Sequence, residues 1–171
     1  MKTIHNTEEF LALIGPDGRV TEPVQLAEGC ELDDLTGLRS LDGVTLAEGC
    51  ALYDLTGLRS LEGVTLAEGC VLFGLTGLTS LDGVALAEGC WLDNLTGLTS
   101  LNGVNLVEGC WMSEYIPWGI HFLADRLCIG CETFLLGVTD TEITTVIEEH
   151  DAGQYTARIF DAVNLWRAWI A

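Results

Sequence analysis

The sequence has very few basic side chains. Lys2 is its single lysine, and 7 Lys plus Arg stand against 26 Asp plus Glu, which gives a formal net charge of −19 over 171 residues. DNA, RNA and anionic membranes would repel a chain of this charge, so we expect no direct binding to any of them. The charge favours cations or a basic protein as partners.

Long apolar runs are also lacking. No stretch of 18 apolar residues occurs, which argues against a transmembrane helix, and residues 1–10 lack the apolar segment of a signal peptide. The hydrophobic fraction is nevertheless 49%, which is too high for a disordered acidic chain. We therefore expect a folded, cytoplasmic protein with an acidic surface.

What the sequence does contain is a repeat with a period of 20 residues. Residues 26–45 read LAEGCELDDLTGLRSLDGVT, three more full copies follow, and a fifth decays after residue 112. A fixed period of this kind is typical of a solenoid, in which each copy forms one coil packed against its neighbours. Apolar residues spaced by two or three, with glycines between them, indicate short straight sides and corners. The best strand candidate is the C-x-L stretch, for example Cys70 to Phe73, paired in parallel between coils.

The copies resemble short bacterial leucine-rich repeats, in which L-x-L-x-x-N-x-L forms a concave strand and its turn. Cys30, Leu32 and Leu35 fill the first, second and asparagine positions. The resemblance implies a β-rich solenoid of parallel coils. Leucine replaces the asparagine ladder, so a single-chain β-helix is the alternative. The L-T-S-L-x-G-V motif with an I-G-C segment is also similar to uncharacterised repeat proteins of phages and prophages, and that second resemblance implies no activity.

Three segments are expected along the chain. They are an N-terminal cap with a short helix (1–25), the solenoid (26–112) and an α/β C-terminal cap with two helices (113–171). Caps are needed because the end coils of a solenoid would otherwise expose apolar core and unpaired strand edges. Thr7, followed by two glutamates and several apolar residues, predicts the short capped helix of the first segment.

The C-terminal cap carries its own signals. Residues 126–134 predict one further irregular strand, and Thr139 with Glu142 forms a capping-box pattern that opens a helix to about residue 149. A last helix is predicted over about 151–169. Its apolar stripe either covers the last coil or makes a homodimer contact. The stripe consists of Tyr155, Ile159, Phe160, Val163, Trp166 and Ile170.

Most cysteines follow the repeat. Cys30, Cys50, Cys70, Cys90 and Cys110 form one column, which predicts buried free thiols and a reducing compartment. Cys128 and Cys131 make a lone C-x-x-C, without the second pair of a zinc site or the context of a redox site. His5, His121 and His150 are scattered and are interpreted as structural or surface residues. We predict no metal and no cofactor.

Catalysis finds little support in the sequence. The serines recur with the repeat, which predicts turn residues and not nucleophiles, and the glycines are corners at a fixed period and not a phosphate-binding loop. The recurring serines are Ser40, Ser60, Ser80 and Ser100. We therefore predict a protein without enzymatic activity, in which Cys128 and Cys131 would be the candidates for any chemistry.

Two columns of the repeat carry carboxylates. The first is Glu28, Glu48, Glu68, Glu88 and Glu108, and the second is Asp42, Glu62 and Asp82, ending in Asn102. Like charges about 5 Å apart repel by on the order of 1 kcal/mol in water, a cost that local propensity does not explain. The columns are interpreted in three ways: a solvated edge duplicated with the repeat, a cation site, or a mimic of a phosphate backbone.

Two other columns vary between copies and are predicted to face outward. They are Glu31, Ala51, Val71, Trp91 and Trp111, and Asp33, Tyr53, Phe73, Asp93 and Ser113. Contiguous exposed aromatic residues mark a partner surface. Alternatively, Trp91 and Trp111 pack under the C-terminal segment.

The predicted function is binding of another protein that is itself basic. The candidate contacts are the two acidic columns together with Asp33, Tyr53, Phe73, Asp93, Trp91 and Trp111. The sharper hypothesis is a phage-type inhibitor that imitates nucleic-acid charge and blocks a basic host defence or nucleic-acid-processing protein, as an anti-CRISPR protein would. The alternative is a rigid spacer or oligomerisation module that uses its C-terminal helix.

Overall fold

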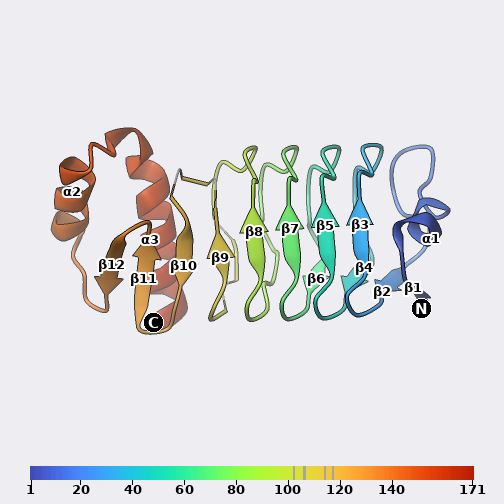
Figure 1. Cartoon of the computed structure of the whole chain (residues 1–171), viewed down its shortest axis with the longest axis horizontal. Coiled ribbons are helices and arrows are strands. Elements are labelled where there is room, and N and C mark those ends of the chain that lie inside the picture. The colour runs from blue at the N-terminus through green and yellow to red at the C-terminus, as the bar shows by residue number, and fades with distance from the viewer. Residues whose placement is uncertain (102, 106, 114, 117) are drawn as a thin grey trace.

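The computed structural model describes residues 1–101, 103–105, 107–113, 115–116 and 118–171. Figure 1 shows a rod in which coils are stacked along the long axis, with the N-terminus at one end and the C-terminal helices at the other. Successive coils are 20 residues apart and pair in parallel. The structure confirms the predicted β-solenoid with a helical C-terminal end.

Each coil contributes one strand to the larger of two sheets. In the part of the rod formed by the repeats, these strands are β3 (Glu31–Asp33), β5 (Ala51–Tyr53), β7 (Val71–Phe73), β8 (Trp91–Asp93) and β9 (Trp111–Met112). The pairing places each residue beside its counterpart one repeat later. Leu72, at the middle of β7, points into the core and its two neighbours point outward. The strand predicted at Cys70 to Phe73 is confirmed from Val71 onward.

A smaller sheet, which the sequence analysis did not predict, forms the opposite side of each coil. Its strands are β1 (Lys2–Ile4), β2 (Val24–Leu26), β4 (Val44–Leu46) and β6 (Thr65–Leu66). Parallel bridges continue the same column through Ala85 to Asn105. Val44 and Leu46 are buried while Thr45 between them is partly exposed, which is the inward and outward alternation of a strand.

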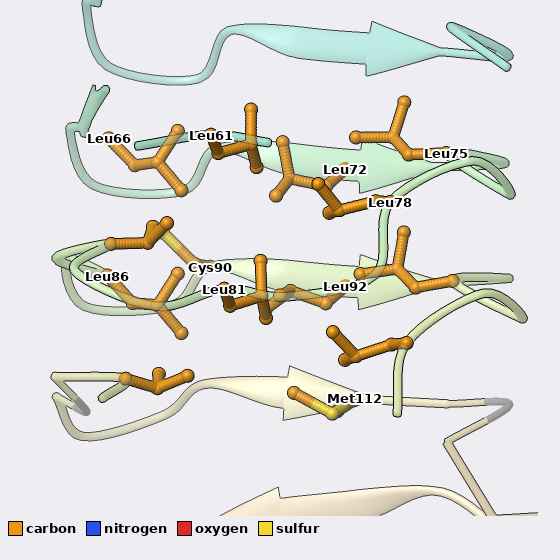
Figure 2. Packing of buried hydrophobic residues seen from close by; sticks show 14 of the residues in the cluster. Leu61, Leu66, Leu72, Leu75, Leu78, Leu81, Leu86, Cys90, Leu92 and Met112 are labelled. Carbon is orange, nitrogen blue, oxygen red and sulfur yellow. The ribbon is translucent and has the colours of Figure 1, made fainter. Parts of the chain in front are cut away.

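Leucines from every side of the coil meet in one continuous core (Figure 2). Leu61, Leu72 and Leu78 are each at most 1% exposed; Leu61 lies over Leu81, and Leu72 over Leu92, in each case the equivalent residue one copy later. Full burial of a leucine contributes roughly 1.5–3 kcal/mol. Because a coil this narrow has no core of its own, its stability comes from stacking on its neighbours.

The N-terminal end is closed by β1, which pairs with β2, and by the short helix α1 (Thr7–Leu11). The N-cap of α1 is Asn6, whose side chain accepts a hydrogen bond from the backbone N–H of Glu9 at 2.9 Å. Phe10 is fully buried against the first coil. The N-terminal cap is therefore an added strand with a helix of five residues, and the helix alone does not cover the end of the rod.

After β9 the chain changes from parallel to antiparallel pairing. The strands β10 (Ile120–Phe122), β11 (Arg126–Ile129) and β12 (Glu132–Leu135) extend the larger sheet. The prediction of one strand over residues 126–134 is wrong, because the chain reverses between β11 and β12. Gly130 makes the reversal possible, since its φ of 60° is a conformation that glycine adopts without steric cost.

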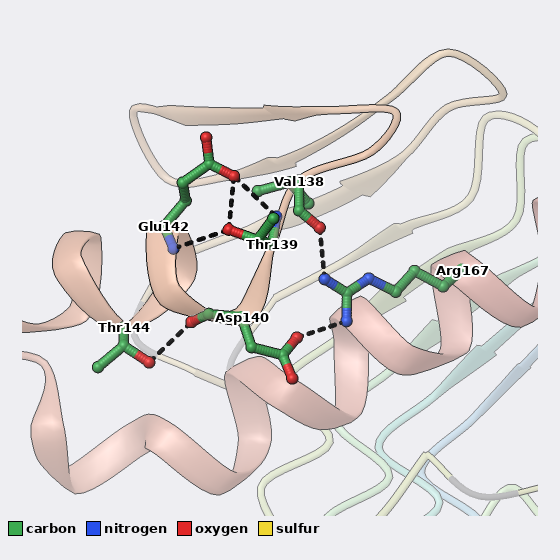
Figure 3. A network of polar contacts seen from close by, with 6 residues as sticks. All are labelled: Val138, Thr139, Asp140, Glu142, Thr144 and Arg167. Carbon is green, nitrogen blue, oxygen red and sulfur yellow. Dashed lines mark hydrogen bonds and ion pairs between the residues drawn. The ribbon is translucent and has the colours of Figure 1, made fainter.

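Two helices follow this hairpin, and polar contacts hold them together (Figure 3). In α2 (Asp140–Glu149) the predicted capping box is present, and hydrogen bonds from the Thr139 backbone and hydroxyl lower the pKa of Glu142. Arg167, in the last turn of α3, donates hydrogen bonds to the Asp140 carboxylate at 2.7 Å and to the Val138 carbonyl at 2.6 Å. These bonds fix the start of α2 against the end of α3.

The last helix, α3 (Thr156–Ile170), follows a short 3-10 turn, η1 (Gly153–Tyr155), and covers the end of the rod. Trp166 is fully buried, and its Nε1 donates to the carbonyl of Leu123 at 2.8 Å. Asp161 accepts hydrogen bonds from the Tyr115 hydroxyl at 2.7 Å and from the Leu101 backbone N–H at 3.4 Å. Burial and the Asp161 contact raise the pKa of Tyr115.

The apolar stripe predicted for α3 is turned toward the last coils. Ile159, Val163 and Trp166 are buried, while Phe160 and Ile170 are partly exposed. The stripe therefore covers the end of the solenoid, and a homodimer through this helix stays a prediction. Within the part of the chain that the structure describes, no helix combines the length and the apolar character needed to cross a membrane.

Candidate functional site

The Glu28 column occupies the turns between the two sheets. In the first copy the Cys30 backbone N–H donates to the Ala27 carbonyl, and Gly29 has a φ of 66°. This is the arrangement of a type II turn, which needs a positive φ at its third residue and leaves the second residue, here Glu28, facing solvent. The turns stack through backbone bonds such as Gly29 N–H to Glu48 carbonyl at 2.9 Å. Every glutamate of the column is exposed.

The Asp42 column occupies a second set of turns of the same kind. The Val44 backbone N–H donates to the Leu41 carbonyl, and Gly43 has a φ of 77°. The Ser40 hydroxyl accepts a hydrogen bond from the Asp42 backbone N–H at 3.0 Å, and the same bond recurs in the next two copies. These repeating serines are thus turn residues, as predicted. Asn102, which ends the column in the sequence, lies outside the described residues.

The two acidic columns flank the smaller sheet. Chain order is decisive here: in each copy the Asp42-type turn precedes the strand Val44–Leu46, and the Glu48-type turn follows it. The surface between the columns carries only side chains of small or moderate size. They are Gln25, Thr45, Thr65, Ala85 and Asn105. We call this surface, with its two columns of carboxylates, the acidic face.

Few cations offset the acidic face. Arg19 pairs with Asp42 at 3.1 Å, but both side chains are about 62% exposed, so the pair contributes little. Arg39 and Arg59 donate to the carbonyls of Gly57 and Gly77 in the following coil, on another side of the rod. Among the described residues, Asp42 is therefore the one carboxylate of the acidic face that makes an ion pair within 4 Å.

The predicted aromatic contacts lie on the larger sheet and not on the acidic face. Tyr53 and Phe73 are neighbours in one column, with ring centroids 6.3 Å apart. Trp91 and Trp111 lie edge to face at 4.9 Å in the adjacent column. Both pairs point outward, because the residues between them in the strands are buried.

Trp91 and Trp111 differ in their surroundings. Trp91 is 51% exposed. Trp111 is partly covered by the C-terminal segment, since a Cβ on Gly119 would lie only 3.0 Å from its ring. Packing under the cap is thus found for Trp111, whereas Trp91 is exposed and its place in a partner surface stays a prediction.

The remaining predicted contacts, Asp33 and Asp93, also lie on the larger sheet. Asp33 is exposed on β3, and Asp93 on β8 is half-buried because it accepts a hydrogen bond from the hydroxyl of Ser113. The fourteen predicted contact residues therefore fall on two surfaces, and the Glu28 column lies on the turns that join them.

The cysteine column is buried, as predicted. Each thiol from Cys50 onward donates to the carbonyl of an alanine in the preceding coil, for example Cys50 to Ala27 at 3.0 Å. Burial raises the pKa of Cys30 and of Cys70 to about 11. The neighbouring Cys110 thiol and burial both raise the pKa of Cys90. These thiols are free and inaccessible.

The C-x-x-C motif does not form a pair, and a different group of residues comes together. Cys128 lies on β11, with its sulfur 3.8 Å from the Thr133 hydroxyl, while Cys131 lies in the turn before β12. Cys131, Glu132 and His150 present ligand atoms that all lie within 4.8 Å of one another. Sequence reasoning missed this group because His150 is 19 residues from Cys131. Gly130, which interrupts the two apolar segments that form β11 and β12, is the sequence signal that could have located the turn.

Comparison of the chain with protein-family models, with curated proteins and with solved structures gives no match.

Proposed function

We propose that this chain is a non-enzymatic repeat protein that binds a basic protein through the acidic face. The observation that carries the proposal is the pair of carboxylate columns at fixed turn positions on either side of the smaller sheet. Turn geometry requires the glycines and not the acids, because the second position of a type II turn accepts most residues. The acidic character is thus an additional property of the repeat.

The charge spacing supports mimicry of a nucleic acid. Neighbouring coils lie about 4.8 Å apart, so the first three coils, with two column carboxylates each, carry about one negative charge per 2.4 Å of rod. Double-stranded DNA carries about one per 1.7 Å of its axis. A rigid rod of similar charge density would attract the basic groove of a partner protein with much of the electrostatic strength of DNA. The sharper form of the proposal is a phage-type inhibitor that occupies such a groove in a host defence or nucleic-acid-processing protein.

The aromatic residues of the larger sheet are the second contact element of the proposal. Because Tyr53, Phe73 and Trp91 lie on another side of the rod, a partner reaches both elements only by wrapping around the Glu28 column. The acidic face is therefore expected to dominate the encounter, and the aromatic residues to add apolar contact area.

The test is capture of a partner from host lysate on the immobilised protein at low and at high ionic strength. We expect a basic protein to be retained at low salt, released at high salt and displaced by duplex DNA. Glu68→Lys combined with Glu88→Lys should weaken its affinity by roughly tenfold or more, since each reversal costs on the order of 1 kcal/mol.

The matched control is Glu148→Lys with Glu149→Lys, which changes the net charge equally at two exposed residues of α2. This variant should retain the partner. An equal loss of affinity in both variants would show that net charge, and not the acidic face, determines binding. Absence of any basic partner at low salt would refute the proposal. A rigid oligomerisation module, in contrast, would show a concentration-dependent mass in light scattering and no response to either pair of reversals.

A further inference from the structure

A group of three possible metal ligands lies where the β11–β12 turn meets the end of α2. Cys131 is in the turn, Glu132 begins β12, and His150 is the C-cap residue of α2. His150 Nε2 lies 3.0 Å from Glu132 Oε1, and Cys131 Sγ lies 3.7 Å from the same oxygen. All three residues are in contact with solvent, so an ion can reach them.

The donor types and their spacing match zinc coordination. Zinc binds thiolate, imidazole and carboxylate at roughly 2.0–2.3 Å with tetrahedral angles, which places any two donor atoms roughly 3.3–3.6 Å apart. The two separations from Glu132 Oε1, 3.0 Å to His150 Nε2 and 3.7 Å to Cys131 Sγ, lie within a few tenths of an ångström of that range. The Cys131 and His150 donor atoms lie within 4.8 Å of each other, so side-chain rotation has to bring this pair together to close the three donors around one ion.

The electrostatic surroundings also favour a cation. His150 lies at the C-terminal end of α2, where the helix dipole presents its negative end, and that helix has no basic residue in its last turn. Glu148, Glu149 and Asp151 are its immediate neighbours and are exposed. A divalent ion here would take the place of the hydrogen bond between His150 and Glu132.

An apolar cavity of about 50 Å³ borders the group. Cys131, Glu132 and His150 line it together with Trp118, Phe134 and Ile147. Trp118 is held edge to face against Tyr155 at 5.4 Å. Three protein ligands next to such a cavity would leave the fourth coordination position of zinc open to water or a small ligand.

We propose that Cys131, Glu132 and His150 form a binding site for Zn²⁺, with one coordination position open. Cys128, the other half of the C-x-x-C motif, does not take part. Binding converts the Cys131 thiol to a thiolate and releases its proton to the buffer.

The test uses the full chain, reduced, treated with a chelator and dialysed, and then titrated with Zn²⁺ in competition with a chromophoric chelator. We expect one ion per chain and a proton release that calorimetry detects in buffers of different ionisation enthalpy. Cys131→Ser and His150→Gln should each lower the affinity about 100-fold. Titration with Co²⁺ should give a thiolate charge-transfer band that disappears in Cys131→Ser.

The matched controls are Cys128→Ser, on the same hairpin, and His121→Gln on β10. Both should bind Zn²⁺ as the unmodified chain does, and circular dichroism should show that all variants are folded. The proposal is overturned if no stoichiometric binding occurs, if Cys131→Ser binds as tightly as the unmodified chain, or if Cys128→Ser loses as much affinity as Cys131→Ser. Unselective binding by surface carboxylates would produce the second of these results.

Discussion

The solenoid and the C-terminal cap are stabilised in different ways. In residues 26–112, nearly every contact is repeated one coil later: the leucine columns, the two turns and the thiol-to-carbonyl bonds all recur. In residues 113–171 the main contacts occur once, such as the bonds from Trp166 to Leu123 and from Tyr115 to Asp161. A lost contact in the solenoid leaves its counterparts in place, whereas a lost contact in the cap has no substitute.

The same difference applies to the two candidate sites. Repetition builds the acidic face from equivalent turns, so its strength lies in the number of carboxylates. The group of Cys131, Glu132 and His150 is built where one hairpin meets one helix. No second copy of these residues exists, so the proposed Zn²⁺ site needs each of the three. Removing one carboxylate should therefore weaken the acidic face only in part, whereas removing one ligand should abolish most of the metal affinity proposed for the cap.

The largest expected effect is on the cap. Trp166→Ala removes a fully buried indole and leaves the Leu123 carbonyl without its donor. We expect the free energy of unfolding to fall by about 3–5 kcal/mol, measured by chemical denaturation. The control is Trp169→Ala, at a partly exposed position of the same helix, which should cost much less. Similar losses from the two substitutions would show that α3 does not hold the cap through Trp166.

An intermediate effect is expected from one glycine column of the solenoid. A Cβ on Gly77 would lie 2.8 Å from the Leu58 carbonyl and closer still to that of Thr56, whereas a Cβ on Gly37 would meet nothing within 4 Å. Gly77→Ala should therefore destabilise the chain by about 1–3 kcal/mol through overpacking. Gly37→Ala is the matched control, since it is the same position in the first copy. Comparable stability of the two variants in thermal denaturation would contradict the close coil stacking.

A third expected effect is a dependence on alkaline pH. The folded-state pKa of Cys70 is raised from 9.0 to about 11, so its contribution to stability is complete below pH 9 and is lost between pH 9 and 11. The loss is about 1.4 kcal/mol per pH unit for each such thiol, because the unfolded chain ionises while the folded chain does not. Denaturant titrations at pH 8 and 10.5 measure it. Cys70→Ala should show a shallower decline, and an unchanged decline would count against a buried, titrating column.

The sequence predicted the solenoid well because its copies could be compared within one chain. Invariant leucines marked the core, and variable positions such as 71 and 73 marked the outward side of a strand. The smaller sheet was missed although Val44-Thr45-Leu46 has the same alternation as β7, because three residues of this kind also fit a corner. A strand and a corner at these residues can be told apart only when the path of the whole coil is known.

The cap was predicted less completely because its chain path depends on single residues. Gly130 reverses the chain within what otherwise resembles one strand, and no second copy of the segment exists for comparison. The acidic columns could be identified from the sequence, but their separation from the aromatic residues requires the fold of the coil. The proximity of His150 to Cys131 depends on how α2 packs on the hairpin, which no periodic pattern indicates.

The in-register pairing of copies 20 residues apart also makes the repeat a unit of length. Duplication of any one of the first three copies would lengthen the rod by about 4.8 Å and add two carboxylates to the acidic face, without altering either end. Deletion of one copy would shorten it by the same step. The length and the charge of the rod could thus change together, in fixed increments of one copy.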